Sequence, residues 1–178
     1  MKKVISTVML FLCLITNSQN KIYSGEKSYS STPSFEFNQE ANSFNHLDSY
    51  YEFLNLSVGK TNQGGIILLE KNNRINSKNG SFFDLTIETK IKGDLFLYLS
   101  DGSVIRCLDR KIRGYIDNTT SSIYYLTKSE VEKLKSSSIV KIVYNLEVGH
   151  EWLKEIKKFS ASTRMNTTDE IDKLFSDY

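Results

Sequence analysis

From Phe83 to Ile91 apolar side chains alternate with polar ones, and the stretch from Phe83 to Leu108 narrows the possible folds more than any other. An alternation of period two is typical of a β-strand with one buried face. Two glycine-containing pairs interrupt it, Gly93-Asp94 and Asp101-Gly102, and the second suits a two-residue type I′ turn. The sequence therefore predicts three consecutive antiparallel strands: Phe83 to Ile91, Leu95 to Leu99 and Ser103 to Leu108.

A two-residue turn at Asp101-Gly102 also predicts which residues face each other across the hairpin: Leu99 and Val104, Tyr98 and Ile105, Phe96 and Cys107. In this register both faces of the hairpin are apolar. We therefore expect other elements to cover each face.

Two short helices are predicted by capping boxes, in which a threonine and a glutamate three residues later satisfy backbone donors at a helix start. Thr127 with Glu130 begins the first helix, and Thr167 with Glu170 begins the second. The predicted fold is thus α+β, an antiparallel β-meander sheet packed with one or two short helices.

Further strands are expected on both sides of this region. Ser49 to Val58 and Ile66 to Glu70 precede it, although a short helix after Asp48 is an alternative for the first. Ile139 to Val148 alternates as a strand does, with Val140, Ile142, Tyr144, Leu146 and Val148 on one side. Glu151 to Ser162 fits either a helix or a strand.

Residues 1–18 have the parts of a secretory signal peptide. Lys2 and Lys3 give a positive start, Val4 to Ile15 is almost wholly apolar, and small polar residues follow. The apolar run is shorter than the roughly 20 residues that span a bilayer. We expect cleavage after Ser18, no transmembrane segment afterwards, and a location in the periplasm, outside the cell or at its surface.

The predicted organisation after the signal peptide is a flexible polar tether over residues 19–45 and a single α+β domain over residues 46–178. The tether prediction rests on a stretch rich in Ser, Asn and Gln without a sustained period. Its aromatic residues, among them Tyr29, Phe35 and Phe37, leave open that part of it docks on the domain.

Charge and cysteine content exclude several classes of function. Lys2 and Lys3 account for the excess of 23 basic over 21 acidic residues, so the chain from residue 19 on is neutral. A neutral chain gives no basis for binding nucleic acid or an anionic membrane. Removal of the signal also leaves Cys107 as the single cysteine, which rules out an intramolecular disulfide.

No motif for catalysis or cofactor binding is complete. Gly59-Lys60-Thr61 matches only the end of a phosphate-binding loop and is read as a polar turn. Cys107 with His150 is the one conceivable nucleophilic dyad, but Cys107 falls on an apolar face. Metal-ligand spacing is absent, and no cofactor is expected. Carboxylates for a hydrolase are present, without spacing that selects a pair: Asp84, Asp94, Asp109 and Asp117.

Candidate binding residues are two tyrosines and two arginines. Tyr50-Tyr51 and Tyr124-Tyr125 alternate faces in a strand, so one ring of each pair, taken as Tyr51 and Tyr125, is a candidate partner contact. Arg110 and Arg113 belong to a basic cluster that is a candidate anion contact. Tyrosines in such strands ordinarily pack in the core. A basic cluster of this kind ordinarily belongs to a solvated loop.

The order of a hairpin (DLFLYLSDGSVIRCLDR), a capped helix (YYLTKSEVEKL) and a strand (IVKIVYNL) resembles that of small secreted proteins of unknown function from Bacteroidota. The resemblance covers roughly residues 83–148. It implies secretion, and it assigns no activity, cofactor or site residue.

These observations favour a secreted domain without catalytic function that binds a protein or a glycan. The alternatives are a small carboxylate-dependent hydrolase and a structural component of the cell envelope. A hydrolase needs two carboxylates about 5–10 Å apart in a pocket. A binding module needs an exposed apolar or aromatic patch.

Overall fold

The computed structural model describes residues 20–39, 53–72, 89–148 and 154–176. Nine strands form one antiparallel sheet in the order β7-β6-β10-β11-β3-β4-β5-β9-β8. Their bounds are β3 (Phe35–Gln39), β4 (Phe53–Thr61), β5 (Gly64–Asn72), β6 (Lys90–Leu99), β7 (Val104–Cys107), β8 (Ile112–Ile116), β9 (Thr119–Thr127), β10 (Ile139–Val148) and β11 (Glu155–Ser162). A separate hairpin consists of β1 (Lys21–Ser24) and β2 (Lys27–Ser30), and two helices are α2 (Lys128–Ser136) and α3 (Thr168–Ser176). The predicted α+β class, an antiparallel sheet with two short helices, is confirmed.

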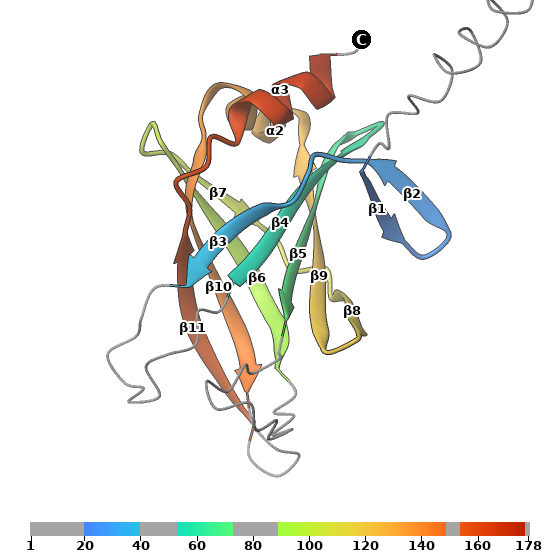
Figure 1. Ribbon diagram of the computed structural model, residues 1–178, viewed down its shortest axis with the longest axis vertical. Coiled ribbons are helices and arrows are strands. Elements are labelled where there is room, and N and C mark those ends of the chain that lie inside the picture. The colour runs from blue at the N-terminus through green and yellow to red at the C-terminus, as the bar shows by residue number, and fades with distance from the viewer. Residues whose placement is uncertain (1–19, 40–52, 73–88, 149–153, 177–178) are drawn as a thin grey trace, which may run out of the picture.

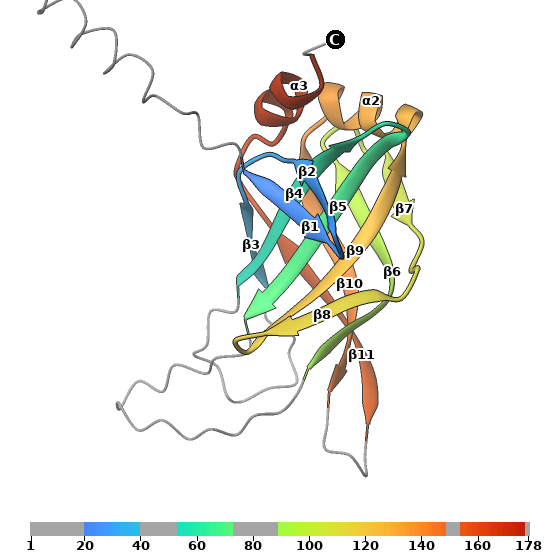
Figure 2. The same ribbon diagram turned by 90° about the vertical axis from the view of Figure 1, so that its right-hand side faces the viewer.

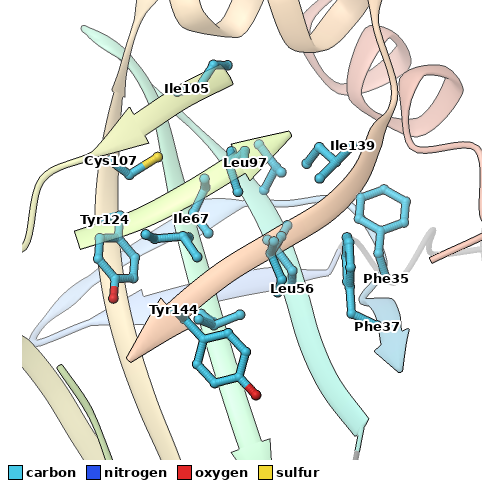
Figure 3. Close-up of a cluster of buried hydrophobic side chains, with 14 of the residues drawn as sticks. Phe35, Phe37, Leu56, Ile67, Leu97, Ile105, Cys107, Tyr124, Ile139 and Tyr144 are labelled. Atoms are coloured by element: carbon cyan, nitrogen blue, oxygen red, sulfur yellow. The ribbon is translucent and has the colours of Figure 1, made fainter. Parts of the chain in front are cut away.

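The large sheet curls, and the inward-facing side chains of its strands form the core (Figures 1 and 2). Alternate residues of each long strand are buried there, as in Leu54, Leu56 and Val58 of β4. Figure 3 shows Leu56, Ile67, Leu97, Cys107 and other members of this cluster. The two helices cover one end of the curl, where Val131, Leu134 and Ile171 complete the core. The curl therefore buries one face of the sheet without a second sheet.

Residues 20–39 are not a tether over the part that the structure describes, so that prediction is wrong there. β3 pairs with β4 on one side and β11 on the other, and Phe35 and Phe37 are fully buried. The β1–β2 hairpin lies on the outer face of the sheet, where Ile22 packs with Ile66 and Ile123 (Figure 2). The aromatic residues decide the outcome, because burying them offsets the entropy of ordering a polar segment.

The hairpin of β6 and β7 has a register one residue away from the predicted one. The observed pairs are Leu95 with Cys107, Phe96 with Arg106, Leu97 with Ile105 and Tyr98 with Val104. A type I′ turn requires positive φ at both central residues, but in Asp101-Gly102 only Gly102 has one, at 85°. Gly102 N donates to Leu99 O at 3.0 Å, so the turn starts at Leu99 and Gly102 is the left-handed residue that follows. This is the geometry of a three-residue loop.

A shift of one residue moves every side chain of a strand to the opposite face. The leucines of β6 consequently share the core with Ile105 and Cys107, whereas Phe96, Tyr98, Val104 and Arg106 lie on the outer face. The expectation that both faces are covered is therefore wrong. Tyr98 and Val104 remain 38% and 44% exposed.

Gly93-Asp94 does not form a turn either. β6 runs through both residues, and Gly93 has φ of 73°, within a bulge where the pairing with β10 shifts between Val143 and Asn145. The part of the predicted strand from Phe83 to Glu88 lies outside the described residues.

Other predictions have mixed outcomes. The capping box of Thr127 and Glu130 is confirmed, with both reciprocal hydrogen bonds present. At α3 the Thr167 hydroxyl accepts from Ile139 N at 2.9 Å, so this side chain joins the helix start to β10. β10 is confirmed as a strand, but a bulge after Ile139 turns Val140 outward. Within the ambiguous segment, Glu155 to Ser162 form the strand β11, and residues 151–153 lie outside the described residues.

Candidate binding surface where the sheet ends meet

The two ends of the curled sheet meet through strands β7 and β8. β7 pairs with β6 near the helices, and β8 pairs with β9 farther away from them. The chain from Leu108 to Lys111 connects the two strands. This junction is built largely by side chains that bind backbone groups of the opposite end.

Asp94 and Asp109 are the centre of the junction. Asp94 Oδ1 accepts from Asp109 N at 2.9 Å, and Asp109 Oδ2 accepts from Gly93 N at 2.9 Å. Asp109 Oδ1 also accepts from Lys111 N at 2.7 Å, and Lys111 has a φ of 60°. The two carboxylates thereby fix the bulge of β6 against the connection between β7 and β8.

An arginine neutralises each of these carboxylates. Arg106 donates from Nε to Asp94 Oδ2 at 2.7 Å and also contacts it through Nη2 at 2.6 Å. Arg113 forms an ion pair with Asp109, and its Nε donates to Ile91 O at 2.7 Å. Arg113 therefore connects β8 to β6 through its side chain. The backbones of these two strands do not pair with each other in the sheet.

β9 contributes two further contacts to β6. Thr120 Oγ1 accepts from Ile91 N at 3.4 Å, and Tyr124 Oη donates to Gly93 O at 3.2 Å. Burial raises the pKa of Tyr124 to about 12, so the hydroxyl keeps the proton that it donates. These side chains satisfy backbone groups that would otherwise be unpaired at the end of a sheet.

Asp94 acts as an ionised hydrogen-bond acceptor at the junction. The hydrogen bond from Asp109 N, followed by that from Arg106, lowers the pKa of Asp94 below the ordinary 3.8. A general acid needs a raised pKa, so Asp94 has the opposite electrostatic environment. Asp117 lies exposed in the β8–β9 turn, and Asp84 lies outside the described residues. This geometry does not favour a hydrolase built on these carboxylates.

Cys107 is buried in the core, with 1% of its surface exposed. Burial raises its pKa to about 12, and the charges of Glu130 and Asp94 act in the same direction. A nucleophilic cysteine needs the thiolate form, which this environment suppresses. His150, the other member of the conceivable dyad, lies outside the described residues. Over the described ranges, no group of three histidine, cysteine or acidic side chains could hold a metal ion.

Three of the four predicted binding residues lie at or beside the junction. Tyr124 points into the core and Tyr125 outward, as the alternation predicts, and Tyr125 is 37% exposed. The guanidinium of Arg110 lies over the Tyr125 ring, 5.6 Å from its centroid. Arg113 is a structural residue of the junction rather than an exposed anion contact. Tyr51 lies outside the described residues.

Sequence reasoning missed the exposed residues on the outer face of β6 and β7. Together with the predicted pair they form what we call the junction surface: Phe96, Tyr98, Val104, Arg106, Leu108, Arg110 and Tyr125. The alternation of β7 contained the necessary signal, since Val104, Arg106 and Leu108 are two residues apart. The wrong register assigned Phe96 and Tyr98 to one face and Val104 and Leu108 to the opposite face, and both faces were expected to be covered.

Gly59-Lys60-Thr61 is the end of β4 rather than a polar turn, which follows it at Asn62 and Gln63. Gly59 pairs with Ile66, and Lys60 Nζ donates to Leu174 O of α3 at 3.3 Å. The lysine is thus used to hold the end of a helix.

Comparisons of this chain with protein-family models, characterised proteins and solved structures find no match. In the part of the chain that the structure describes, no helix has the length and apolar character needed to cross a membrane.

Proposed function

We propose that this protein is a secreted domain without catalytic function that binds another protein through the junction surface. The observation that carries the proposal is the exposure of apolar side chains beside ordered arginines on this surface. Val104 and Leu108 are 44% and 56% exposed, and Tyr98 pairs directly with Val104. Tyrosine and arginine are the residues that most often dominate binding energy at protein interfaces.

The arginines of the junction surface are held in place before any partner arrives. Arg106 is fixed by Asp94 and lies over the Phe96 ring, 6.0 Å from its centroid. The guanidinium of Arg110 lies over the Tyr125 ring. Side chains that are already ordered lose less conformational entropy on binding, which favours affinity.

A protein partner fits this surface better than a glycan. Sugar rings stack on open aromatic faces, but guanidinium groups lie over one face of Phe96 and of Tyr125. Val104 and Leu108 are aliphatic, and aliphatic side chains pack favourably on the apolar groups of another protein.

Secretion is the second part of the proposal and rests on the signal-peptide pattern of residues 1–18. Its test is the mass of the exported protein. We expect a product that begins at Gln19 and is recovered outside the cytoplasm. Recovery of the uncut chain in the cytoplasm would contradict this part.

Binding is tested by placing a photo-crosslinking amino acid at Val104 or Tyr125 and irradiating intact cells. Both positions are partly exposed on the junction surface, so we expect each to give the same discrete adduct with a protein. Ile116 and Tyr23 are the matched controls, because they are 74% and 68% exposed and belong to other parts of the surface. Equal adducts from controls and test positions, or none from the test positions, would contradict the proposal.

A further inference from the structure

The β1–β2 hairpin is held on the outer face of the large sheet by few contacts (Figure 2). In its two strands only Ile22 is fully buried, and Tyr29 is partly buried beside it. Over residues 21–29, the described part of the protein contains no hydrogen bond or ion pair from the hairpin to the sheet. A segment with so few attachments opens more readily than the body of a fold.

The backbone attachment of the hairpin is concentrated at its base. Ser31 forms a single bridge with Gly59. Thr32 N donates to Val58 O at 2.8 Å, and Thr32 Oγ1 accepts from Val58 N at 3.1 Å. These bonds fix the chain before β3 begins, so the hairpin can swing about Ser31 while β3 stays in the sheet. An isolated two-stranded hairpin is marginally stable in water, so its strands should loosen when it leaves the sheet.

The hairpin covers what we call the apolar strip, which lies on the outer face of β5, β9 and β8 and consists of Ile66, Leu68, Ile112 and Ile123. Ile66 is fully buried and Ile123 is 6% exposed, although both belong to a cluster separate from the main core. Gly59 permits this close cover, because a Cβ there would lie 3.1 Å from Ile22 Cδ1. An apolar patch of this kind, once uncovered, is typical of a protein interaction site.

The apolar strip is continuous with the junction surface. Tyr125 of the junction surface pairs with Ile66. Ile123 lies two residues away on the same face of β9 and pairs with Leu68 on one side and Ile112 on the other. The junction surface alone is smaller than an interface of standard size, which takes about 20–30 residues from each partner. A partner bound there gains most by extending onto the apolar surface directly beside it.

We infer that the β1–β2 hairpin is an autoinhibitory strap, which covers part of the partner-binding surface and is displaced when the partner protein binds. This inference rests on the proposed binding function and adds its regulation. In the free protein the hairpin occupies the apolar strip. In the complex, aliphatic or aromatic side chains of the partner take the places of Ile22 and Tyr29, so the strip stays out of water in both states. Because only the open fraction binds in full, the hairpin lowers the apparent affinity by that fraction.

The first test is hydrogen exchange of the purified protein, measured on peptides from the hairpin and from β4 and β5. We expect the hairpin amides to be at least about tenfold less protected than those of β4 and β5, because the hairpin opens locally. Ile22→Asp removes the apolar anchor and should leave the hairpin almost unprotected while β4 and β5 stay protected. Tyr23→Asp is the matched control, since Tyr23 is the next residue and 68% exposed, and it should preserve the protection of the hairpin.

Two results of this measurement would overturn the inference. If Ile22→Asp abolishes protection in β4 and β5 as well, or prevents folding, the hairpin is part of the cooperative fold and not a separate strap. Equal protection of the hairpin in the two variants would show that Ile22 does not hold it closed.

The second test repeats the crosslinking in intact cells with the photoreactive residue at Leu68, which is partly buried in the apolar strip. We expect the same adduct that Val104 gives, and about threefold more of it with Ile22→Asp than with Tyr23→Asp. If Val104 gives the adduct and Leu68 does not in either variant, the strap inference fails and the proposed function stands. If Val104 gives none, the proposed function fails and the inference fails with it.

Discussion

Asp94 and Asp109 each accept a hydrogen bond from the backbone of the other's segment, Asp94 from Asp109 N and Asp109 from Gly93 N, both at 2.9 Å. This reciprocal pair joins the bulge of β6 to the connection between β7 and β8. Because the two ends of the sheet meet here through side chains, the integrity of the junction depends on a few identifiable groups.

Replacing Asp109 with alanine should destabilise the fold. The change removes the acceptor of Gly93 N and Lys111 N and leaves Arg113, whose side chain is 22% exposed, without its carboxylate. Hydrogen bonds to charged groups contribute about 1.5–3 kcal/mol, so a loss of about 2 kcal/mol in the free energy of unfolding is expected from urea denaturation. Asp172→Ala on the exposed surface of α3 is the control and should change it by about 0.5 kcal/mol or less. Equal effects of the two changes would show that the junction contributes nothing special.

The stability contributed by Asp94 should depend on pH in a defined direction. Its pKa in the folded protein lies below the ordinary 3.8, because the Asp109 N–H and Arg106 favour the carboxylate. Such a group stabilises the fold above the unfolded pKa, and the contribution is lost as pH falls through the folded pKa. Urea midpoints measured from about pH 6 down to about pH 2 should therefore fall more steeply for the natural protein than for Asp94→Asn. Parallel curves would rule out this role for Asp94.

Two glycines with positive φ should differ sharply in their tolerance of alanine. Gly102 has φ of 85° and open space where the Cβ of an alanine would lie, so Gly102→Ala costs only the strain of the left-handed backbone, about 1–2 kcal/mol. At Gly64 the same carbon would collide with the carbonyl oxygen of Leu126 in the neighbouring strand. Gly64→Ala should lower the melting temperature far more than Gly102→Ala. Similar melting temperatures would be inconsistent with the close approach of β5 and β9.

Cys107 should be inert toward thiol reagents while the protein is folded. The side chain is buried, and its pKa of about 12 leaves almost no thiolate near pH 8. Labelling with iodoacetamide should be very slow in buffer and complete in urea. Rapid labelling of the folded protein would mean that the core opens at β7 or that the thiol has an activating neighbour.

Alternation of apolar residues was sufficient to predict strands such as β7 and β10 and the fold class, because a half-buried strand imposes that period on its sequence. It was not sufficient for the register of β6 and β7. Asp101-Gly102 is compatible with a two-residue or a three-residue loop, and only the backbone angle at Asp101 distinguishes them. The loop is one residue longer than predicted, and the resulting register pairs Tyr98 with Val104 on the exposed outer face.

The junction was not predictable in the same way. Asp94, Asp109, Arg106 and Arg113 resemble ordinary surface charges in the sequence, and their contacts depend on how far the sheet curls. The β8–β9 hairpin did leave a local signal. Asp117 and Asn118 both have positive φ, at 49° and 62°, and aspartate and asparagine are the non-glycine residues that tolerate such a two-residue turn.

The position of β3 has a consequence for the order of folding. This strand lies near the start of the described chain, yet Gln39 pairs with Ala161 of β11, close to the other end. The sheet cannot be completed until the residues of β11 are available, however early β3 is synthesised. Contacts between residues so distant in sequence slow folding, because a long loop must close before they form. The complete sheet should therefore form only after the residues of β11 have been synthesised.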